Sequence, residues 1–427
     1  MNQKLFSYIA ASPTAFHAVH TSAERLKKAG YLPLQERDAW TLAPGQGYYV
    51  TRNSSSLIAF RVPEGDFSGF MIAAAHGDSP AFKIKENAIL EDAHYVRFST
   101  EGYGGMLCAS WMDRPLSVAG RVLVRENGGL ATKLVDLKEI TAIIPNVAIH
   151  FNRNANSGTA YNAAVDMLPL CGLKGAKDFR AQIAACAGVD ADKLVTTDLI
   201  VYNPQPGIEW NGLISAPRLD DLQCAFSALE GFLSAEKAEN LPVYCLFDNE
   251  EVGSQTKQGA ASTFLYDVLT RICRALLLDG EGYRRKVAGS FLLSCDNAHG
   301  VHPNHPEYMD KNHAVYPNAG IVVKYNANQK YTSDAVSAGL FQLMCEEAGV
   351  PFQRYANRAD MPGGSTLGNI ANTQVSLNTV DIGLAQFAMH SAYETAGADD
   401  PDYMVRALAA FYGKCLKTSC DGSYKLI

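Results

Sequence analysis

The chain of 427 residues is too long for one ordinary domain and fits two, if about 150 residues are taken as typical of a domain. Apolar residues make up 47% of the chain and charged residues only 19%. This composition excludes a disordered protein, which would combine low hydrophobicity with high charge. The 37 basic and 44 acidic residues give a net charge of −7 with no basic tract. Nucleic-acid binding is therefore excluded, because it requires clustered positive charge.

The sequence shows no pattern typical of export or of membrane insertion. Its first six residues lack the basic start of a secretory signal, and no long apolar core or cleavage site follows. No run reaches the roughly 18 apolar residues that span a membrane. The ten cysteines lie far apart without a Cys-x-x-Cys pair, so a disulfide framework or zinc ribbon is not expected. We predict a soluble, globular, cytoplasmic protein without a membrane partner.

In chain order, two helices are predicted first, over residues 3–11 and 15–29, the second capped by Ser12 or Thr14 and ended at Gly30. After them, short apolar runs alternate with amphipathic stretches of helical spacing. The predicted strands are 57–60, 70–75, 243–247, 291–295 and 321–323, and the predicted helices between and after them are 221–235 and 333–348. Apolar strands interleaved with helices indicate an α/β fold whose mixed sheet is covered by helices.

The stretch from about 93 to 213 has a different pattern. Two strand-like runs, 118–125 and 130–137, flank Glu126-Asn127-Gly128-Gly129 and predict a hairpin that turns at Asn-Gly. A further strand-like run, 199–202, lies near its end. We predict a discontinuous α/β domain, residues 1–92 and 214–427, and an inserted β-rich domain, residues 93–213.

Several predicted strands end directly in a side chain that can bind a metal. His76 follows the strand 70–75, Glu250 and Glu251 follow 243–247, and Asp296 follows 291–295. His390 follows a mixed stretch, 382–389. Because α/β sheets bind ligands at the carboxyl ends of their strands, we expect these side chains to form one site.

Two of these motifs have a direct chemical interpretation. Asp78 lies two residues after His76, on the same side of an extended chain, and can hold the free N–H of a metal-bound imidazole. The adjacent carboxylates Glu250 and Glu251 repel one another unless a cation or proton intervenes. One of them can bind a metal while the other meets the metal-bound water. Taken alone, the two motifs are also compatible with a loop after a strand and with a solvated acidic loop.

The remaining ligands complete a plausible count for two metal ions. Asp220 precedes a predicted helix, where the alternative role is an N-cap. We interpret His299 and His302, which follow Asp296, as supporting or structural residues. Two zinc ions bridged by a carboxylate need about five to six protein ligands. That number is supplied by His76, Asp220, Glu251, Asp296 and His390, which leaves Glu250 free as the base.

Five ordered motifs resemble those of the M18 metallopeptidases, the aspartyl aminopeptidases. They are Ala75-His76-Gly77-Asp78-Ser79-Pro80, Pro217-Arg218-Leu219-Asp220, Asp248-Asn249-Glu250-Glu251-Val252-Gly253-Ser254, Asp296-Asn297-Ala298-His299-Gly300-Val301-His302-Pro303-Asn304 and Ala388-Met389-His390-Ser391. The resemblance also covers Ala11-Ser12-Pro13-Thr14 and, in the insert, Ile144-Pro145-Asn146-Val147-Ala148-Ile149-His150.

The resemblance implies a zinc exopeptidase with two zinc ions per subunit, for which Co²⁺ or Mn²⁺ could substitute, and an inserted dimerisation domain. It implies these roles: His76 and Asp296 hold one ion, Glu251 and His390 hold the other, Asp220 bridges them, Asp78 orients His76, and Glu250 is the general base and then acid. His150 would reach into a neighbouring subunit's active site within a tetrahedral dodecamer and steady the tetrahedral intermediate. Lys324 would meet the acidic side chain of the substrate.

The expected function is thus release of N-terminal residues, preferably Asp or Glu, from peptides with a free N-terminus. One departure from the family is Asp221, where members commonly carry Asn. We interpret Asp221 as a favourable start to the helix, with tighter metal binding as the alternative. Two other functions stay open: a related dinuclear deacylase or carboxypeptidase, and a catalytically silent, self-assembling peptide-binding shell.

Overall fold

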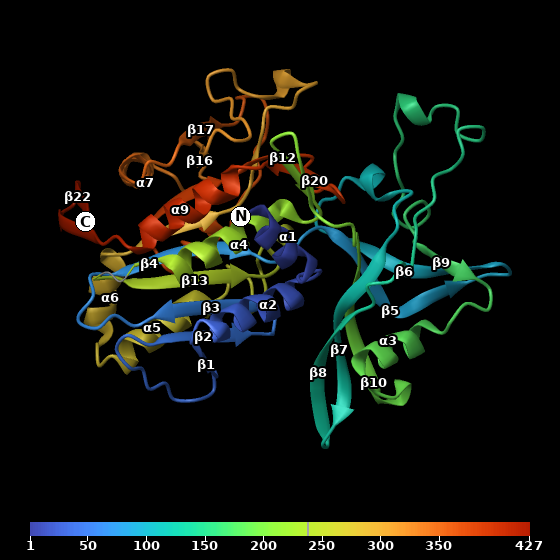
Figure 1. Cartoon of the computed structure of the whole chain (residues 1–427), viewed down its shortest axis with the longest axis horizontal. Helices are drawn as coiled ribbons and strands as arrows, with labels where there is room; N and C mark the ends of the chain where they lie inside the picture. Colours follow the sequence, from blue (N-terminus) through green and yellow to red (C-terminus); the bar gives the residue numbers. More distant parts are fainter. Residues whose placement is uncertain (237–238) are drawn as a thin grey trace.

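The computed structural model describes residues 1–236 and 239–427, and its centre is a nine-stranded mixed sheet (Figure 1). In spatial order the strands are β1 (Leu32–Leu34), β2 (Gly47–Arg52), β3 (Ser56–Arg61), β13 (Leu241–Phe247), β4 (Phe70–His76), β14 (Phe291–Cys295), β18 (Asn378–Gly383), β16 (Ile321–Tyr325) and β17 (Phe352–Ala356). The central strands β13, β4 and β14 run parallel, so their carboxyl ends lie at one edge.

This sheet is buried on both faces. Every residue of β4, β13 and β14 is buried. In β4, Ala73 and Ala75 belong to the core on one face, and Ile72 and Ala74 belong to the core on the other. A strand with two buried faces needs a continuous apolar run, which explains why these strands could be predicted from composition.

Helices cover the two faces of the sheet. One face packs against α1 (Asn2–Ala10), α2 (Ala15–Lys28), α4 (Leu219–Ser234), α7 (Ala335–Glu347) and α9 (Asp400–Tyr412), and the other against α5 (Phe264–Ala275), α6 (Gly280–Ala288) and α8 (Leu367–Ala371). The predicted α/β class is confirmed, and the four predicted helices correspond to α1, α2, α4 and α7. Thr14 caps α2, because its side chain accepts a hydrogen bond from the His17 N–H.

A six-stranded sheet lies beside the nine-stranded one and has its own apolar core (Figure 1). Its strands, in spatial order, are β8 (Gly129–Asp136), β7 (Ser117–Glu126), β10 (Leu194–Tyr202), β5 (Ala81–Glu91), β6 (Tyr95–Tyr103) and β9 (Leu170–Leu173), and α3 (Phe179–Ala187) packs on it. The predicted hairpin is confirmed as β7 and β8, which pair up to Glu126 and Gly129 around the Asn-Gly turn.

The limits of this sheet differ from the predicted boundaries at residues 93 and 213. The sheet begins with β5, so the position predicted as the start of the insert lies in the turn between β5 and β6. It ends with β10 at Tyr202. The reason is that β5 follows β4 after only four residues, Gly77 to Pro80, without a linker that the sequence would reveal.

The third sheet is smaller and has five strands. Its order is β11 (Ile208–Trp210), β12 (Leu213–Ala216), β20 (Glu394–Gly397), β19 (Ala385–Phe387) and β15 (Ala298–His299). A terminal hairpin, β21 (Leu416–Cys420) and β22 (Ser423–Leu426), completes the strands of the described residues. Within those residues, every helix is too short or too polar to cross a membrane.

Candidate metal centre

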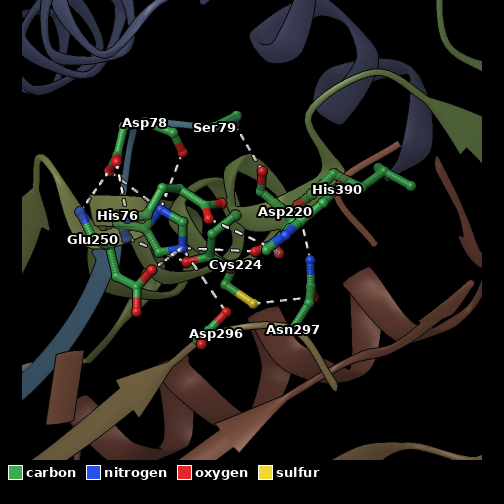
Figure 2. A network of polar contacts seen from close by, with 12 residues as sticks. His76, Asp78, Ser79, Asp220, Cys224, Glu250, Asp296, Asn297 and His390 are labelled. Carbon is green, nitrogen blue, oxygen red and sulfur yellow. Dashed lines mark hydrogen bonds and ion pairs between the residues drawn. The ribbon is translucent and has the colours of Figure 1, made fainter. Parts of the chain in front are cut away.

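The ends of three parallel strands bring a histidine and several carboxylates together (Figure 2). His76 is the last residue of β4 and lies opposite Phe247 of β13, after which the chain continues to Glu250 and Glu251. Asp296 follows β14, the strand on the other side of β4. His76, Asp296 and the turn with Glu250 and Glu251 therefore lie at one edge of the sheet.

Asp220 lies between the two histidines. Its Oδ1 is 3.6 Å from His76 Nε2, and its Oδ2 is 3.5 Å from His390 Nε2. Asp220 is almost fully buried at the start of α4, where its backbone is not helical. Each oxygen of one carboxylate thus faces a different imidazole, which is the arrangement that a bridging ligand requires.

The other carboxylates divide between the two histidines. Asp296 Oδ1 and Glu250 Oε2 lie 3.9 Å and 4.0 Å from His76 Nε2. Glu251 Oε2 lies 3.3 Å from His390 Nε2. His390 comes from the turn between β19 and β20, in a left-handed backbone conformation with φ of 66°. The six side chains form a compact cluster with one histidine at each end.

The chemistry of this cluster fits divalent cations. Asp220 Oδ1 and Glu251 Oε1 are buried and have no hydrogen-bond partner within the described residues. Three sets of potential ligand atoms lie within 4.8 Å of one another: His76 with Glu250 and Glu251, His76 with Asp221 and Asp296, and Asp220 with Glu251 and His390. Buried oxygens without partners are costly unless a cation satisfies them.

The close packing of buried carboxyl groups in this cluster also shifts their pKa values. Burial, followed by the neighbouring negative charges, raises the pKa of Glu251 well above its usual value and that of Glu250 to about 8. Burial also opposes ionisation of Asp220, but contacts with His390 and His76 outweigh it and lower the pKa of that carboxyl. Bound dications would offset both the burial of these carboxylates and the repulsion between them.

Asp78 contacts both the end of β4 and the turn that follows β13. Its Oδ1 is 3.4 Å and its carbonyl oxygen 3.1 Å from His76 Nδ1, so both lie next to the ring nitrogen that points away from Asp220. The Asp78 carboxylate also accepts hydrogen bonds from the backbone N–H groups of Glu250 and Glu251, both at 3.2 Å. Asp78 therefore fixes the histidine and the acidic turn relative to each other.

The structure corrects the preferred interpretation of Asp221. Its backbone is not helical, and its carboxylate accepts a hydrogen bond from the backbone N–H of His76 at 3.2 Å. The side chain is fully buried, and burial raises its pKa well above the usual value. Asp221 thus belongs to the carboxylate cluster next to His76 and Asp296, and not to an exposed first turn.

Two residues of this site were missed by sequence reasoning. Glu394, in β20, accepts hydrogen bonds from the backbone N–H groups of Asp220 at 2.9 Å and His390 at 2.8 Å. Tyr103, at the end of β6, donates a hydrogen bond to Asp78 at 2.7 Å. Nothing in the sequence around either residue distinguishes it from an ordinary strand residue, because both act through contacts with distant segments.

The two predicted residues outside the metal cluster have different surroundings. Lys324 is 1% exposed, lies 3.5 Å from Asp296 Oδ2, and donates to the carbonyl oxygens of Asp296 and Asn297 at 2.8 and 3.3 Å. His150 is exposed, and within the described residues no hydrogen bond or ion pair connects it to the cluster. Between β8 and β9, Ala142, Ile144 and Met167 pack into the core of the six-stranded sheet, whereas an exposed loop of this segment projects away from both large sheets (Figure 1).

Comparison with known proteins places these observations in one family. The family model described as "Aminopeptidase I zinc metalloprotease (M18)" matches residues 8–412. The "Probable M18 family aminopeptidase 2" of Pseudomonas paraeruginosa is 44% identical over 424 residues, with 96% of this chain and 98% of that protein covered.

Solved structures agree with this result. The cryo-EM structure of the Ape4 and Nbr1 complex is similar with a TM-score of 0.93 and 33% identity, covering 96% of this chain and 85% of that one. The structure of the S. cerevisiae mApe1 dodecamer is similar with a TM-score of 0.84 and 27% identity, covering 96% and 95%.

Proposed function

Since the chain belongs to the M18 family of zinc aminopeptidases, we propose that it releases N-terminal Asp or Glu from peptides at a site with two zinc ions. The observation that carries this proposal is the position of Asp220 between His76 and His390, at 3.6 and 3.5 Å. A carboxylate with one oxygen toward each of two imidazoles is suited to bridge two cations.

In this proposal His76 and Asp296 would hold one ion, Glu251 and His390 would hold the other, and Asp220 would contribute to both sites. Histidine nitrogen and carboxylate oxygen are the ligand types that zinc accepts, and Co²⁺ or Mn²⁺ could take its place. Two bound ions supply the Lewis acidity that lowers the pKa of a shared water and polarises the scissile carbonyl.

Glu250 acts as the general base and then as the acid. The distance between Glu250 Oε2 and His76 Nε2 is 4.0 Å, and the Glu250 side chain is only partly exposed. A carboxyl group at this position can accept a proton from water and return it. Glu250 takes the proton of the attacking water and returns it to the leaving amine.

The acidic preference rests on Lys324. Its ammonium group is buried beside Asp296, where water has little access to the positive charge. A desolvated cation favours a substrate carboxylate over a neutral or basic side chain. The Lys324 ammonium group has three oxygen contacts, at 2.8, 3.3 and 3.5 Å, of which Asp296 Oδ2 is the most distant. The substrate carboxylate would share the ammonium group with this oxygen.

A substrate panel tests activity and preference together. We expect the wild type to cleave Asp- and Glu-terminated peptides faster than Leu- and Lys-terminated ones, and to leave N-acetylated peptides intact. In Lys324→Met, which removes the charge but keeps an unbranched side chain one atom shorter, we expect the acidic preference in kcat/KM to fall about 10-fold or more. The exposed Lys330→Met serves as the control.

Other outcomes would decide for different functions. Cleavage of N-acetylated substrates would indicate a deacylase or carboxypeptidase. A preference for Leu in the wild type, or an unchanged acidic preference in a folded Lys324→Met variant, would refute the role of Lys324. Absence of hydrolysis by a zinc-loaded wild type would favour the silent peptide-binding shell.

We further propose that the chain forms a homo-oligomer, a tetrahedral dodecamer, through the six-stranded sheet and its loops. Large apolar side chains are exposed there, including Val147, Ile149, Phe151 (88% exposed), Val165 and Leu173. Exposed apolar groups of this size are typical of an interface.

The ten cysteines are free, which fits our proposal of a reducing, cytoplasmic location.

Assembly gives His150 its proposed role in the active site of a neighbouring subunit. We expect His150→Ala to reduce kcat without loss of zinc. Co-expression of His150→Ala with Glu250→Gln should restore activity, because each subunit supplies what its neighbour lacks. Mixed particles that stay inactive, although light scattering shows normal assembly, would argue against His150 acting between subunits.

A further inference from the structure

The chain that leaves the six-stranded sheet at the end of β6 lies against the candidate metal centre. This segment, from Tyr103 to Leu107, is called the strap here; it leads into a 3₁₀ helix, Cys108–Trp111. Tyr103 Oη donates to Asp78 Oδ2 at 2.7 Å and accepts from Asn249 Nδ2 at 2.8 Å. The first residue of the strap is therefore bonded to the groups that hold His76 and the acidic turn.

The other end of the strap holds His390. The Gly105 carbonyl oxygen accepts a hydrogen bond from His390 Nδ1 at 2.6 Å, and the Leu107 N–H donates to the His390 carbonyl at 3.0 Å. The third hydrogen bond of His390 runs from its N–H to Glu394. A donor at Nδ1 leaves Nε2 free toward Asp220 and Glu251, so the strap selects the tautomer that can bind a metal.

The middle of the strap packs on Glu251. Gly104 has a φ of 71°, a conformation that other residues rarely adopt. A Cβ atom at Gly104 would lie 3.1 Å from the Cβ of Glu251. The strap therefore contacts a group on each side of the cluster, Asp78 near His76 and both Glu251 and His390 at the other end.

We infer that the strap is a positioning element through which the six-stranded sheet controls the affinity of the metal centre, most strongly for the ion held by Glu251 and His390. This inference rests on the proposed function. Residues that hold metal ligands by hydrogen bonds typically change metal affinity about 10–100-fold when they are replaced. His390 depends on the strap most, because two of its three hydrogen bonds end there and its own turn lies outside regular structure.

The strap links the six-stranded sheet to both ends of the metal centre. Tyr103 and Gly105 belong to the chain that continues directly from β6, and His390 belongs to a turn of the five-stranded sheet. Asp78 lies in the short connection from β4 of the nine-stranded sheet to β5 of the six-stranded sheet. A displacement of the six-stranded sheet would therefore move hydrogen-bond partners at both ends of the metal centre at once. Surfaces far from the site can influence it by this route.

Two variants of the strap test this in the full-length protein. Tyr103→Phe keeps the ring but removes the hydrogen bond to Asp78. Gly104→Ala introduces a methyl group against Glu251 in a left-handed conformation. Zinc affinity is measured by competition with a chelator, and the Co²⁺-substituted protein is examined by visible absorption, which reports ligand geometry independently of activity.

Two glycines provide matched controls. Gly102→Ala adds a methyl group one residue before the strap, where the nearest atom is 3.6 Å away. Gly128→Ala adds one at a φ of 77° in the β7–β8 turn, with nothing within 4 Å. The first controls for a methyl group on β6, and the second for backbone strain at positive φ.

We expect Tyr103→Phe to weaken zinc binding about 10-fold. Gly104→Ala should weaken binding of the ion held by Glu251 and His390 about 10–100-fold and alter the Co²⁺ spectrum. The controls should bind like the wild type. Unchanged zinc affinity and Co²⁺ spectra in both folded strap variants would overturn the inference. A wild type that binds no zinc would instead refute the proposed function on which the inference rests.

Discussion

Replacement of Glu250 by glutamine is expected to lower kcat about 10²–10⁴-fold, the contribution of a positioned general base. The amide has nearly the shape of the carboxyl group but cannot accept the proton of the attacking water. Since the proposed ligands do not include Glu250, zinc content should stay at the wild-type value. Steady-state kinetics with an Asp-terminated peptide, together with metal analysis, measures both quantities.

The control for this variant is Glu139→Gln, which makes the same chemical change at an exposed position. It should leave kcat, zinc content and melting temperature unchanged. Normal turnover by zinc-loaded Glu250→Gln would disprove the assignment of Glu250 as the base. A loss of zinc in that variant would show that Glu250 is a ligand instead.

Replacement of Asp220 by asparagine is expected to have the largest effect on the metal centre. Asp220 is the one side chain of the described cluster with a carboxylate oxygen within 3.6 Å of a ring nitrogen of each histidine, His76 and His390. A neutral amide cannot bridge two cations as a carboxylate does, so zinc content should fall below two per subunit. Activity should fall at least about 10³-fold, because metal polarisation contributes several kcal/mol.

Stability offers a second measure of the Asp220 variant. A ligand present at about 1,000 times its Kd stabilises the folded state by about 4 kcal/mol. Zinc should therefore raise the melting temperature of the wild type, and much less that of Asp220→Asn. The exposed Asp190→Asn should respond to zinc like the wild type. Two zinc ions retained by Asp220→Asn would contradict the bridging role.

The inner strands β4, β13 and β14 of the central sheet could be predicted from the sequence because their environment is uniform. In β4, β13 and β14 every position is buried, so each strand is almost entirely apolar, with Ser294 and the terminal His76 as the exceptions. A charged or imidazole side chain can then occur only where the strand ends. This explains why the positions of His76 and Asp296 could be predicted before any contact was known.

The environment of a residue beyond the strand ends could not be predicted in the same way. Asp221 follows Asp220 at the start of α4, where an acidic residue usually interacts with the helix dipole. The structure instead turns its carboxylate to the His76 N–H, 145 residues away in sequence. Local sequence pattern cannot distinguish these roles, because it contains no information about which strand lies against the helix start.

The length and apolar content of the chain, together with the positions of its metal-binding side chains, thus specified an α/β protein with a metal centre. These properties are local: burial on two faces requires apolar runs, and ligands follow the ends of those runs. The folded chain was needed to reveal Glu394, Tyr103 and the start of the six-stranded sheet at β5. Their roles depend on hydrogen bonds between segments far apart in sequence, and such pairings arise only when the sheets pack together.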